Sequence, residues 1–247
     1  AALQADSCEI YTDVDGIYTA DPRWVPAARK LDRMAYEELL EMAGAGAKVV
    51  QMRSVQLAAR YEVPLHVRSA LRLDRSGTTV VREDPRMEAT LVSGVTHTIN
   101  EAKIAVRRIP DRPGVAARLF DPLARANINV DMIVQTIDTA GNSEIGFTVA
   151  KEDLKKTLQL TEPAARAIGA AQVEAAGDVS KVSIIGVGMR SHAGVAAKLF
   201  EVLAGEQINI LLISTSEIKV SVVIDMPHAK RAVSALHAAF GLDEKAP

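Results

Sequence analysis

The sequence predicts an α+β protein in which two βαββαβ modules follow an N-terminal α/β segment, with the first module inserted into the second. The heptapeptide GVAARLF at 114–120 recurs as GVAAKLF at 194–200, an offset of 80 residues (194 − 114 = 80). The offset persists downstream, where Ile133 meets Ile213. A match in fixed register indicates a duplication, and two copies are too few for a solenoid. We therefore expect a pair of like modules.

Composition excludes several classes of protein. The chain has 247 residues, of which 48% are hydrophobic and 24% charged, as is typical of soluble globular proteins. A formal net charge of −2 provides no field for a polyanion, which disfavours nucleic acid as a partner. The single cysteine, Cys8, excludes an internal disulfide and fits a reducing compartment, so we expect a cytoplasmic location. No stretch reaches the roughly 18 apolar residues that a membrane span needs.

The N-terminal segment reads as short strands alternating with helices. Residues 1–6 resemble the last turn of a helix cut from a longer chain. A strand is expected at 7–12, ahead of an Asp-Gly turn, and another at 65–69. Helices are expected at 32–43 and from Ser54, as the N-cap, to Tyr61. Because 72–88 is charged and rich in turn residues, we assign 1–72 to this segment and 73–89 to a linker.

The two modules account for the remainder of the chain. In the first, strands are expected at 103–109, 129–138, 144–149 and 172–176, and helices at 115–126 and 151–169, the latter interrupted by Pro163. The second repeats this order but has only seven residues after its last helix at 228–240, too few for a final strand. An unassigned strand at 90–99 is the substitute. The second module is therefore expected to comprise 90–100 and 178–247, and the first 101–177.

The loop that precedes the repeated helix has a possible chemical use in each copy. A helix N-terminus offers backbone N–H groups and partial positive charge to a carboxylate, and Gly114 or Gly194 would allow close approach. Asp111 could accept an ammonium group, so the first loop suits a free amino acid. The alternative is a simple turn and cap. In the second copy the aspartate is replaced by Ser191, followed by His192, so a site there should be weaker or different.

The N-terminal segment also carries polar residues with two interpretations each. The run 12–23 contains acids that could hold Mg²⁺ or ribose hydroxyls and an arginine that could clamp phosphate, or it is a solvated turn. Lys48 is a phosphate contact or an ordinary surface lysine. The five histidines show no spacing typical of a metal site. Cys8 is expected to be a buried thiol, and Trp24 to pack on the neighbouring domain.

Three stretches of the N-terminal segment resemble the nucleotide-binding part of aspartate kinases. They are ADSCEIYTDVDGIYTADPR at 5–23, YEEL at 36–39 and GAKVVQMRSV at 46–55. The duplicated modules resemble the paired ACT domains of that family, which have a ferredoxin-like fold, and the resemblance covers essentially the whole chain. It implies an α/β amino-acid-kinase remnant followed by two ACT domains, and a homo-oligomer that forms through them.

The family resemblance also implies activity, ligands and site residues. Aspartate kinases phosphorylate the β-carboxylate of aspartate with ATP and Mg²⁺, and their ACT pair binds end products such as lysine or threonine as feedback inhibitors. The implied nucleotide contacts are Thr12, Asp13, Tyr18, Arg23, Lys48 and Val49. The implied effector contacts are Asp111, Gly114, Val115, Ala116 and Gln135, with Asn209 and Ile210 contributed across the ACT–ACT interface.

The sequence departs from the family at its N-terminal side. The family's Lys-Phe/Tyr-Gly-Gly segment, its aspartate-binding residues and its Gly-Arg-Gly-Gly-Ser-Asp loop are absent. Since phosphoryl transfer depends on positioning by such groups, the chain alone is expected to be inactive, with no catalytic residues of its own. The leading hypothesis is the regulatory C-terminal portion of an aspartate kinase.

Two other interpretations remain to be weighed. The chain could be a non-enzymatic amino-acid-sensing ACT module or a small regulatory subunit that acts on a partner kinase, and Met87 is placed for an internal start. A kinase of another amino-acid-kinase class, acting on glutamate or UMP, is disfavoured because those proteins lack tandem ACT domains.

Overall fold

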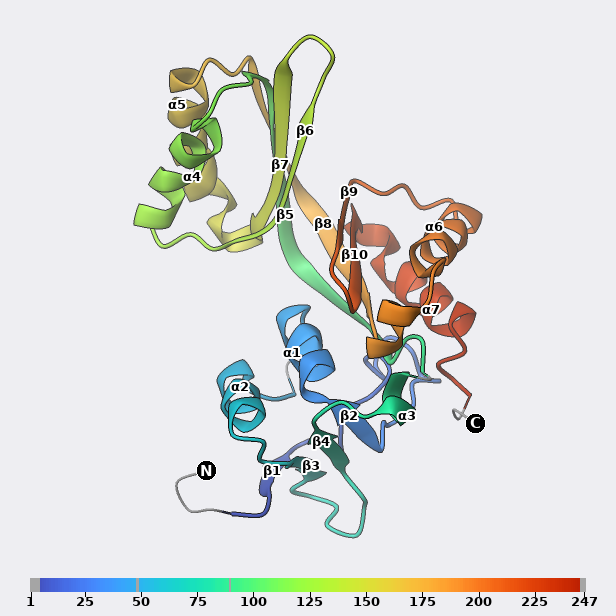
Figure 1. Ribbon diagram of the computed structural model, residues 1–247. Coiled ribbons are helices and arrows are strands. Elements are labelled where there is room, and N and C mark those ends of the chain that lie inside the picture. Colours follow the sequence, from blue (N-terminus) through green and yellow to red (C-terminus); the bar gives the residue numbers. More distant parts are fainter. Residues whose placement is uncertain (1–4, 48, 89, 245–247) are drawn as a thin grey trace.

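Two β-sheets organise the structure, a computed structural model that describes residues 5–47, 49–88 and 90–244 (Figure 1). A four-stranded sheet belongs to the N-terminal part, and a six-stranded sheet runs through both modules. The expected α+β class is confirmed, with the two ferredoxin-like modules following the partial α/β domain. The expectation for residues 1–4 lies outside the described residues.

The N-terminal sheet has the strand order β1-β3-β4-β2 and packs against two helices. β1 and β3 are parallel, β3 and β4 antiparallel, and β2 and β4 parallel. The alternation of the third strand buries Leu65, Val67 and Ser69 on one face, as a half-buried strand requires. The elements are β1 (Cys8–Thr12), β2 (Arg33–Ala35), α1 (Tyr36–Gly44), α2 (Met52–Arg60), β3 (Leu65–Ser69), β4 (Thr78–Val81) and α3 (Pro85–Glu88).

Three boundaries in this part differ from the prediction. The helix expected at 32–43 begins at Tyr36, because 33–35 form β2 and bury Met34 against β4. The second helix begins at Met52 with Gln51 as its N-cap, so Ser54 lies inside it and caps nothing. The expected linker at 73–89 contains β4, which the sheet needs as its link between β2 and β3. Strands of three or four residues carry too little periodicity to be distinguished from loop or helix.

The prediction for Cys8 is wrong, and that for Trp24 is confirmed. Cys8 is exposed because β1 forms an edge of the sheet. Trp24 packs on the second module and stacks on His97, with ring centroids 3.6 Å apart and an interplanar angle of 28°.

The C-terminal sheet has the strand order β6-β7-β5-β8-β10-β9, and its two central strands pass through both modules. We expected separate strands at 90–99 and 103–109, but they form one strand. Residues 94–98 pair with 181–185, and 103–107 pair with 172–176. The first strand of each module therefore continues as the last strand of the other, which is the inserted topology. The strands are β5 (Gly94–Pro110), β6 (Val130–Ile137), β7 (Asn142–Ala150), β8 (Gln172–Ile185), β9 (Leu212–Thr215) and β10 (Lys219–Asp225).

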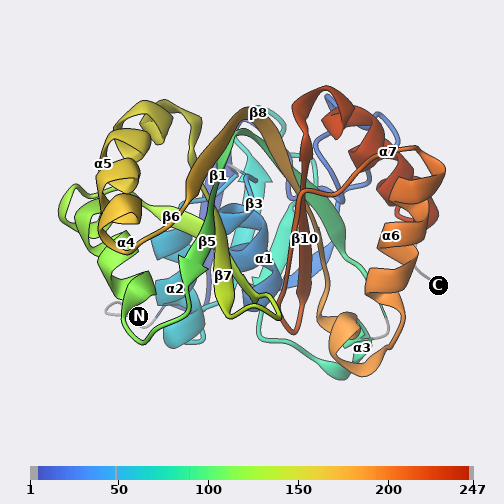
Figure 2. The same cartoon turned by 90° about the horizontal axis from the view of Figure 1, so that it is seen from above.

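Two helices cover each half of this sheet, at opposite ends in the view from above (Figure 2). The equivalent residues Val115 and Leu119, and Val195 and Leu199, are buried at the same helical spacing, so the repeated heptapeptide serves packing. Pro163 does not interrupt its helix, contrary to expectation. The helices are α4 (Val115–Arg125), α5 (Leu154–Ala167), α6 (Val195–Gly205) and α7 (Ala229–Ala239), with 3₁₀ helices η1 (Lys151–Asp153), η2 (Val187–Ser191) and η3 (Met226–His228).

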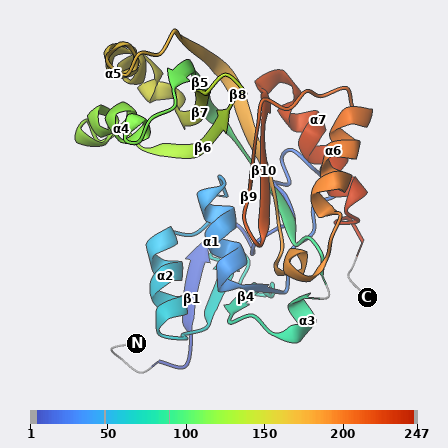
Figure 3. The ribbon, with the colours of Figure 1, turned by 45° about the horizontal axis from the view of Figure 1, so that its top comes forward.

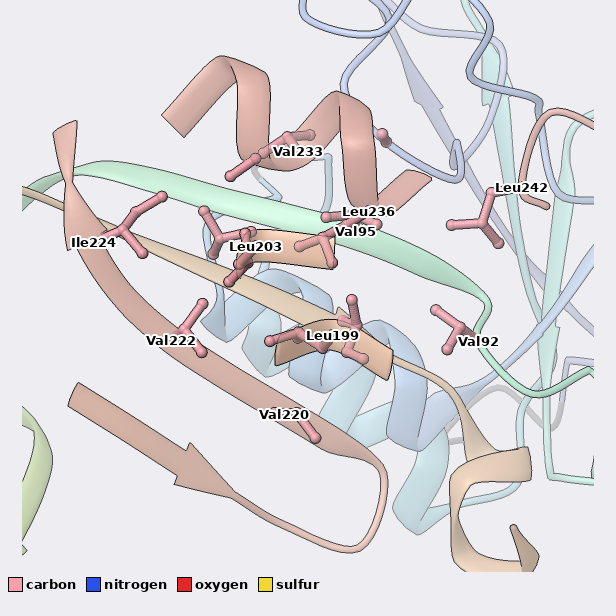
Figure 4. Packing of buried hydrophobic residues seen from close by; sticks show 14 of the residues in the cluster. Val92, Val95, Leu199, Leu203, Val220, Val222, Ile224, Val233, Leu236 and Leu242 are labelled. Atoms are coloured by element: carbon pink, nitrogen blue, oxygen red, sulfur yellow. The ribbon is translucent and has the colours of Figure 1, made fainter. Parts of the chain in front are cut away.

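The N-terminal part shares a core with the second module. Figure 4 shows Leu199 and Leu203 of α6 among apolar residues of β5, β10 and α7. Ala20 and Val25, from the loop before β2, are buried in the same cluster. The backbone N–H of Val95 donates to the carbonyl of Thr19 (2.7 Å), which fixes that loop beside β5. These two parts are therefore packed as one unit.

A cluster of paired charged side chains lies at the junction of the two modules. Glu101 and Lys181 are the same position in the two copies (181 − 101 = 80), and their side chains approach to 3.7 Å between β5 and β8. Both are almost fully buried, and the Lys181 ammonium group also bonds the Asp131 carboxylate. Burial raises the pKa of Glu101. The duplication has thus diverged at this position into opposite charges that pair.

Lys181→Met should lower the free energy of unfolding far more than Glu101→Gln. Losing the cation leaves Glu101 buried beside Asp131 with no positive partner, which costs about 3–5 kcal/mol. Losing Glu101 leaves Lys181 paired with Asp131, and about 1 kcal/mol is expected. Urea unfolding at pH 7 measures both values; equal losses would contradict the assigned pairing.

Glu101→Gln should also flatten the pH dependence of stability. Because the pKa of Glu101 is raised in the folded chain, its contribution is fully present below the unfolded pKa of about 4.5 and is lost as pH rises through the folded value. The difference in unfolding free energy between the two proteins, measured from pH 4 to pH 7, should therefore shift in favour of the variant as pH rises. A difference independent of pH would refute the assignment.

Candidate functional site

A hollow of about 520 Å³ opens between β1, the end of α1 and the start of α2. These three elements lie side by side (Figure 3). Two of the predicted nucleotide contacts, Thr12 and Val49, line the hollow, and Lys48 lies outside the described residues. The lining residues are Ile10, Tyr11, Thr12, Ala43, Ala47, Val49, Val50, Gln51, Met52 and Ser54.

The other predicted nucleotide contacts are not part of the lining. Asp13 accepts a hydrogen bond from the hydroxyl of Thr12 (3.0 Å) and so lies beside it. Tyr18 donates to Asp15 (2.7 Å), and this hydrogen bond lowers the pKa of that carboxyl group. The structure therefore brings Thr12 and Val49 to the hollow and leaves Tyr18 in the loop that follows β1.

Arg23 is paired within its own loop. Its guanidinium group donates to both carboxylate oxygens of Asp21, at 3.0 Å from Nε and 2.7 Å from Nη2. These hydrogen bonds lower the pKa of Asp21. Any phosphate that Arg23 bound would have to compete with this carboxylate, although the exposed side chain is free to move.

The first-module loop assembles a chain of three polar side chains. The Ser143 hydroxyl donates to the Asp111 carboxylate (3.0 Å) and accepts from the Gln135 amide (3.2 Å). Ser143 is only 1% exposed, whereas Asp111 and Gln135 are exposed at the surface. The buried hydroxyl thus fixes two of the predicted effector contacts while leaving their remaining groups open to a ligand. Sequence reasoning missed Ser143, because a serine early in a strand carries no distinctive pattern.

Gly114 precedes α4 for a conformational reason. Its φ is +90°, a left-handed value that favours glycine, and a Cβ there would meet nothing within 4 Å. Gly194 has the same geometry with φ +93°. The left-handed backbone at the turn therefore accounts for the glycines. The backbone N–H of Val115 donates to the carbonyl of Arg112 (3.3 Å), so the N–H of the half-buried Ala116 is what the start of the helix could offer.

The second loop lacks the three-residue chain. Gln135 pairs with Ile145 across its hairpin, whereas the equivalent Thr215 pairs with Val220, so the second hairpin is five residues shorter (145 − 135 = 10 against 220 − 215 = 5). In this register Ser143 corresponds to Ile218 (143 + 75 = 218). Ile218 is buried against Ala35 and Val187 at the contact with the N-terminal part.

Asn209 and Ile210 do not share a site with Asp111 within one chain. Ile210 packs on the core of the second module, and the carbonyl of the next residue, Leu211, accepts from Lys103 Nζ (3.2 Å). Lys103 precedes Asp111 by eight residues (111 − 103 = 8), nearly all of them in β5, which corresponds to roughly 25 Å of extended chain. Their predicted role in the effector site stays a prediction, and it requires a second chain.

Two absences can be stated for the described part of the chain. Among these residues no group of three His, Cys, Asp or Glu side chains is placed to hold a metal ion. None of the helices described there is long and apolar enough to cross a membrane.

Comparison with known families matches both parts of the chain. Residues 96–162 and 182–240 match the ACT domain family, and 1–69 match the amino acid kinase family. The aspartate kinase of Pseudomonas putida is 49% identical over 246 residues, covering 100% of this chain and 60% of the relative. The chain thus spans about 60% of the length of the curated relatives that it matches first.

Solved structures agree with this assignment. A structure of aspartokinase alpha and beta subunits is 49% identical with a TM-score of 0.58, and the match covers 61% of this chain and 99% of that one. E. coli aspartokinase III was solved with aspartate and ADP, and with lysine and aspartate; the two structures are 27% and 29% identical to this chain. Each of these structures has a TM-score of 0.78. The alignments include 96% and 97% of this chain and 53% of each aspartokinase III chain.

The amino acid kinase match at 1–69 is followed by the ACT match from 96, and the similarity to aspartate kinases extends over the whole length of this chain. The chain belongs to the aspartate kinase family.

Proposed function

We propose that this chain is the regulatory C-terminal portion of an aspartate kinase and that its first module binds lysine or threonine as a feedback inhibitor. The whole enzyme would transfer a phosphoryl group from ATP to the β-carboxylate of L-aspartate, with Mg²⁺ shielding the phosphates. The observation that carries the regulatory part is the Gln135–Ser143–Asp111 chain beside the start of α4, because its equivalent is missing in the second module.

The first loop offers complementary groups to a free amino acid. The Asp111 carboxylate, held by Ser143, faces the ammonium group, and charge-assisted hydrogen bonds of this kind contribute about 1.5–3 kcal/mol. The α-carboxylate would meet the start of α4, where Ala116 offers its backbone N–H, Val115 would have to release the carbonyl of Arg112, and the helix dipole adds favourable charge. Gln135 remains available to the amino acid's side chain. E. coli aspartokinase III, solved with lysine and aspartate, supports an amino acid as the ligand class.

The hollow beside β1 would take part of the nucleotide. Its volume lies within the range of about 300–1,000 Å³ typical of small-molecule sites, and its lining combines apolar residues with Thr12 and Gln51. Thr12 and Val49 would contact the nucleotide, with Asp13 beside them, and Tyr18, Arg23 and Lys48 remain predicted contacts.

A second copy of the chain would complete the regulatory site. β6 and β9 are the edge strands of the long sheet, and the equivalent residues Ile133 and Ile213 are exposed on them. Exposed edges with apolar side chains favour pairing with another chain. We infer a homo-oligomer in which Asn209 and Ile210 of one chain approach Asp111 of the other.

A small regulatory subunit is the second candidate. In the structure of aspartokinase alpha and beta subunits, 99% of the matched chain aligns with 61% of this one. This favours a natural unit made of the two modules. The two candidates share the amino-acid site. They differ in the hollow, which would bind nucleotide only in a chain that includes the N-terminal part.

Asp111→Ala should weaken binding of the amino acid by about 10- to 100-fold, the effect of losing one charge-assisted hydrogen bond. Isothermal titration calorimetry with lysine and with threonine measures it. Asp121→Ala, on the exposed face of α4 and paired only with Arg125 among the contacts of the described residues, is the matched control and should leave affinity unchanged. If neither amino acid binds the folded parent chain, the proposed function fails.

Ser143→Ala should reduce affinity for the same amino acid by about 3- to 10-fold, since the carboxylate stays but is no longer held in place. Ser191→Ala, at the position equivalent to Asp111 in the second module, should have no effect on the same titration. Equal effects of the two substitutions would contradict the assignment of the site to the first module.

A further inference from the structure

Glu38 of α1 is a buried carboxylate with three hydrogen-bond donors around it. It is 2% exposed. Its Oε2 accepts from the backbone N–H of Ala35 (3.0 Å), and its Oε1 accepts from the N–H of Val187 (3.1 Å) and from the Ser93 hydroxyl. All three partners donate. A carboxylate satisfies them together, whereas an amide would turn an NH₂ group toward at least one donor.

Two of these donors belong to the second module. Ser93 immediately precedes β5, and Val187 begins η2, the segment that leads into the second loop. The carboxylate therefore joins three places in the sequence: the start of α1, the entry to the long sheet and the loop of the second module. Buried charges that are fully hydrogen-bonded hold such junctions in one arrangement.

The docked segment is η2, which leads into the counterpart of the candidate amino-acid loop. Residues 111–114 and 191–194 are exposed in both modules, but in the second module the start of η2 lies against the N-terminal part, where Val187 and Ile218 pack on Ala35. Ion pairs surround the contact, with Arg190 to Glu83 at 2.5 Å and Lys219 to Glu41 at 2.7 Å. The second module is thus attached to the N-terminal part through the segment before its loop, a contact that the first module does not make.

α1 leads from this contact to the hollow. Ala43, five residues after Glu38, lines the hollow, about 7.5 Å further along the helix (43 − 38 = 5). Two residues beyond the helix, Gly46 lies close against β5, since a Cβ there would be 2.3 Å from the carbonyl oxygen of His97. The helix therefore has the second module near both of its ends, and its C-terminal end forms a wall of the hollow.

We propose that Glu38 is the positioning residue through which the second ACT module sets α1 and, with it, the wall of the hollow. Because β5 and β8 run unbroken through both modules, a change at the first loop reaches Ser93 and Val187 along the same two strands. The coupling half of this proposal rests on the proposed amino-acid site. The positioning half does not, because it concerns contacts within the chain.

Hydrogen–deuterium exchange of the backbone at 40–47 tests both halves on the chain as it is. Glu38→Gln should speed exchange there by roughly tenfold, because one donor is left unsatisfied. Glu37→Gln, on the exposed face of the same helix, is the matched control and should leave exchange unchanged. Exchange in α4 should stay constant in both variants. If 40–47 exchange alike in Glu38→Gln and Glu37→Gln, the positioning role is refuted.

The coupling is measured by adding saturating lysine or threonine. In the parent chain and in Glu37→Gln, the amino acid should change exchange at 40–47, whereas Glu38→Gln should bind it with unchanged affinity and show no change there. A merely structural role for Glu38 would leave this response intact, and that result overturns the coupling. So does an amino acid that binds the parent without affecting 40–47. Failure of either amino acid to bind overturns the proposed function instead.

Ser93→Ala provides a second test in case Glu38→Gln does not fold. It removes one donor but keeps the carboxylate and its bond to Val187, so a smaller increase in exchange at 40–47 is expected, with a cooperative melting transition retained. If the hydroxyl can be removed with no change at 40–47 and no loss of the amino-acid response, Glu38 does not act through the second module.

Discussion

The antiparallel pairing of β5 with β8, which continues through both modules with a shift of register around Glu101, is the constraint on which the rest of the structure depends. Each strand is the first strand of one module and the last of the other, so neither module can form its sheet without the other. The buried Glu101–Lys181 pair lies midway along these two strands, where one module passes into the other. The first copy can be inserted because both strands continue across this junction. A separation of the modules would break the hydrogen bonds of both sheets. The pair therefore behaves as one body with two ends.

The two ends have diverged in use. In the first module a longer hairpin places Ser143 beside Asp111, and the loop before α4 stays open to solvent. In the second, a hairpin five residues shorter carries Ile218 at the same position, and η2, which leads into the loop before α6, is docked on α1 through Val187 and Glu38. The side chain at this position decides the difference, because Ser143 holds Asp111 whereas Ile218 packs on Ala35 and Val187. A duplicated scaffold thus supplies one open loop and one attachment point.

The sequence predicted what repeats and periodicity determine. The offset of 80 located both modules, and the missing last strand of the second indicated the insertion. Short strands escaped, since β2 and β4 have three and four residues and their burial comes from neighbours distant in sequence. The buried partners Ser143 and Glu38 escaped for a related reason. The role of a buried polar residue depends on hydrogen-bond donors and acceptors that the fold brings together, and neighbouring residues in the sequence do not indicate which these are. Cys8 was misjudged because an edge strand exposes residues that an apolar pattern suggests are covered.

The loop that carries Ala20 and Val25 into the core of the second module has a consequence for any shorter form of this chain. A product that started at Met87 would keep both modules but lose these two side chains and the carbonyl of Thr19 that accepts from Val95. Its second module would then present an apolar hole and an unpaired backbone donor to water. Binding to a full-length chain would stabilise such a product only if that chain could insert a second copy of the loop with Ala20 and Val25. Otherwise another surface, such as the matching face of a second short chain, would have to close the gap.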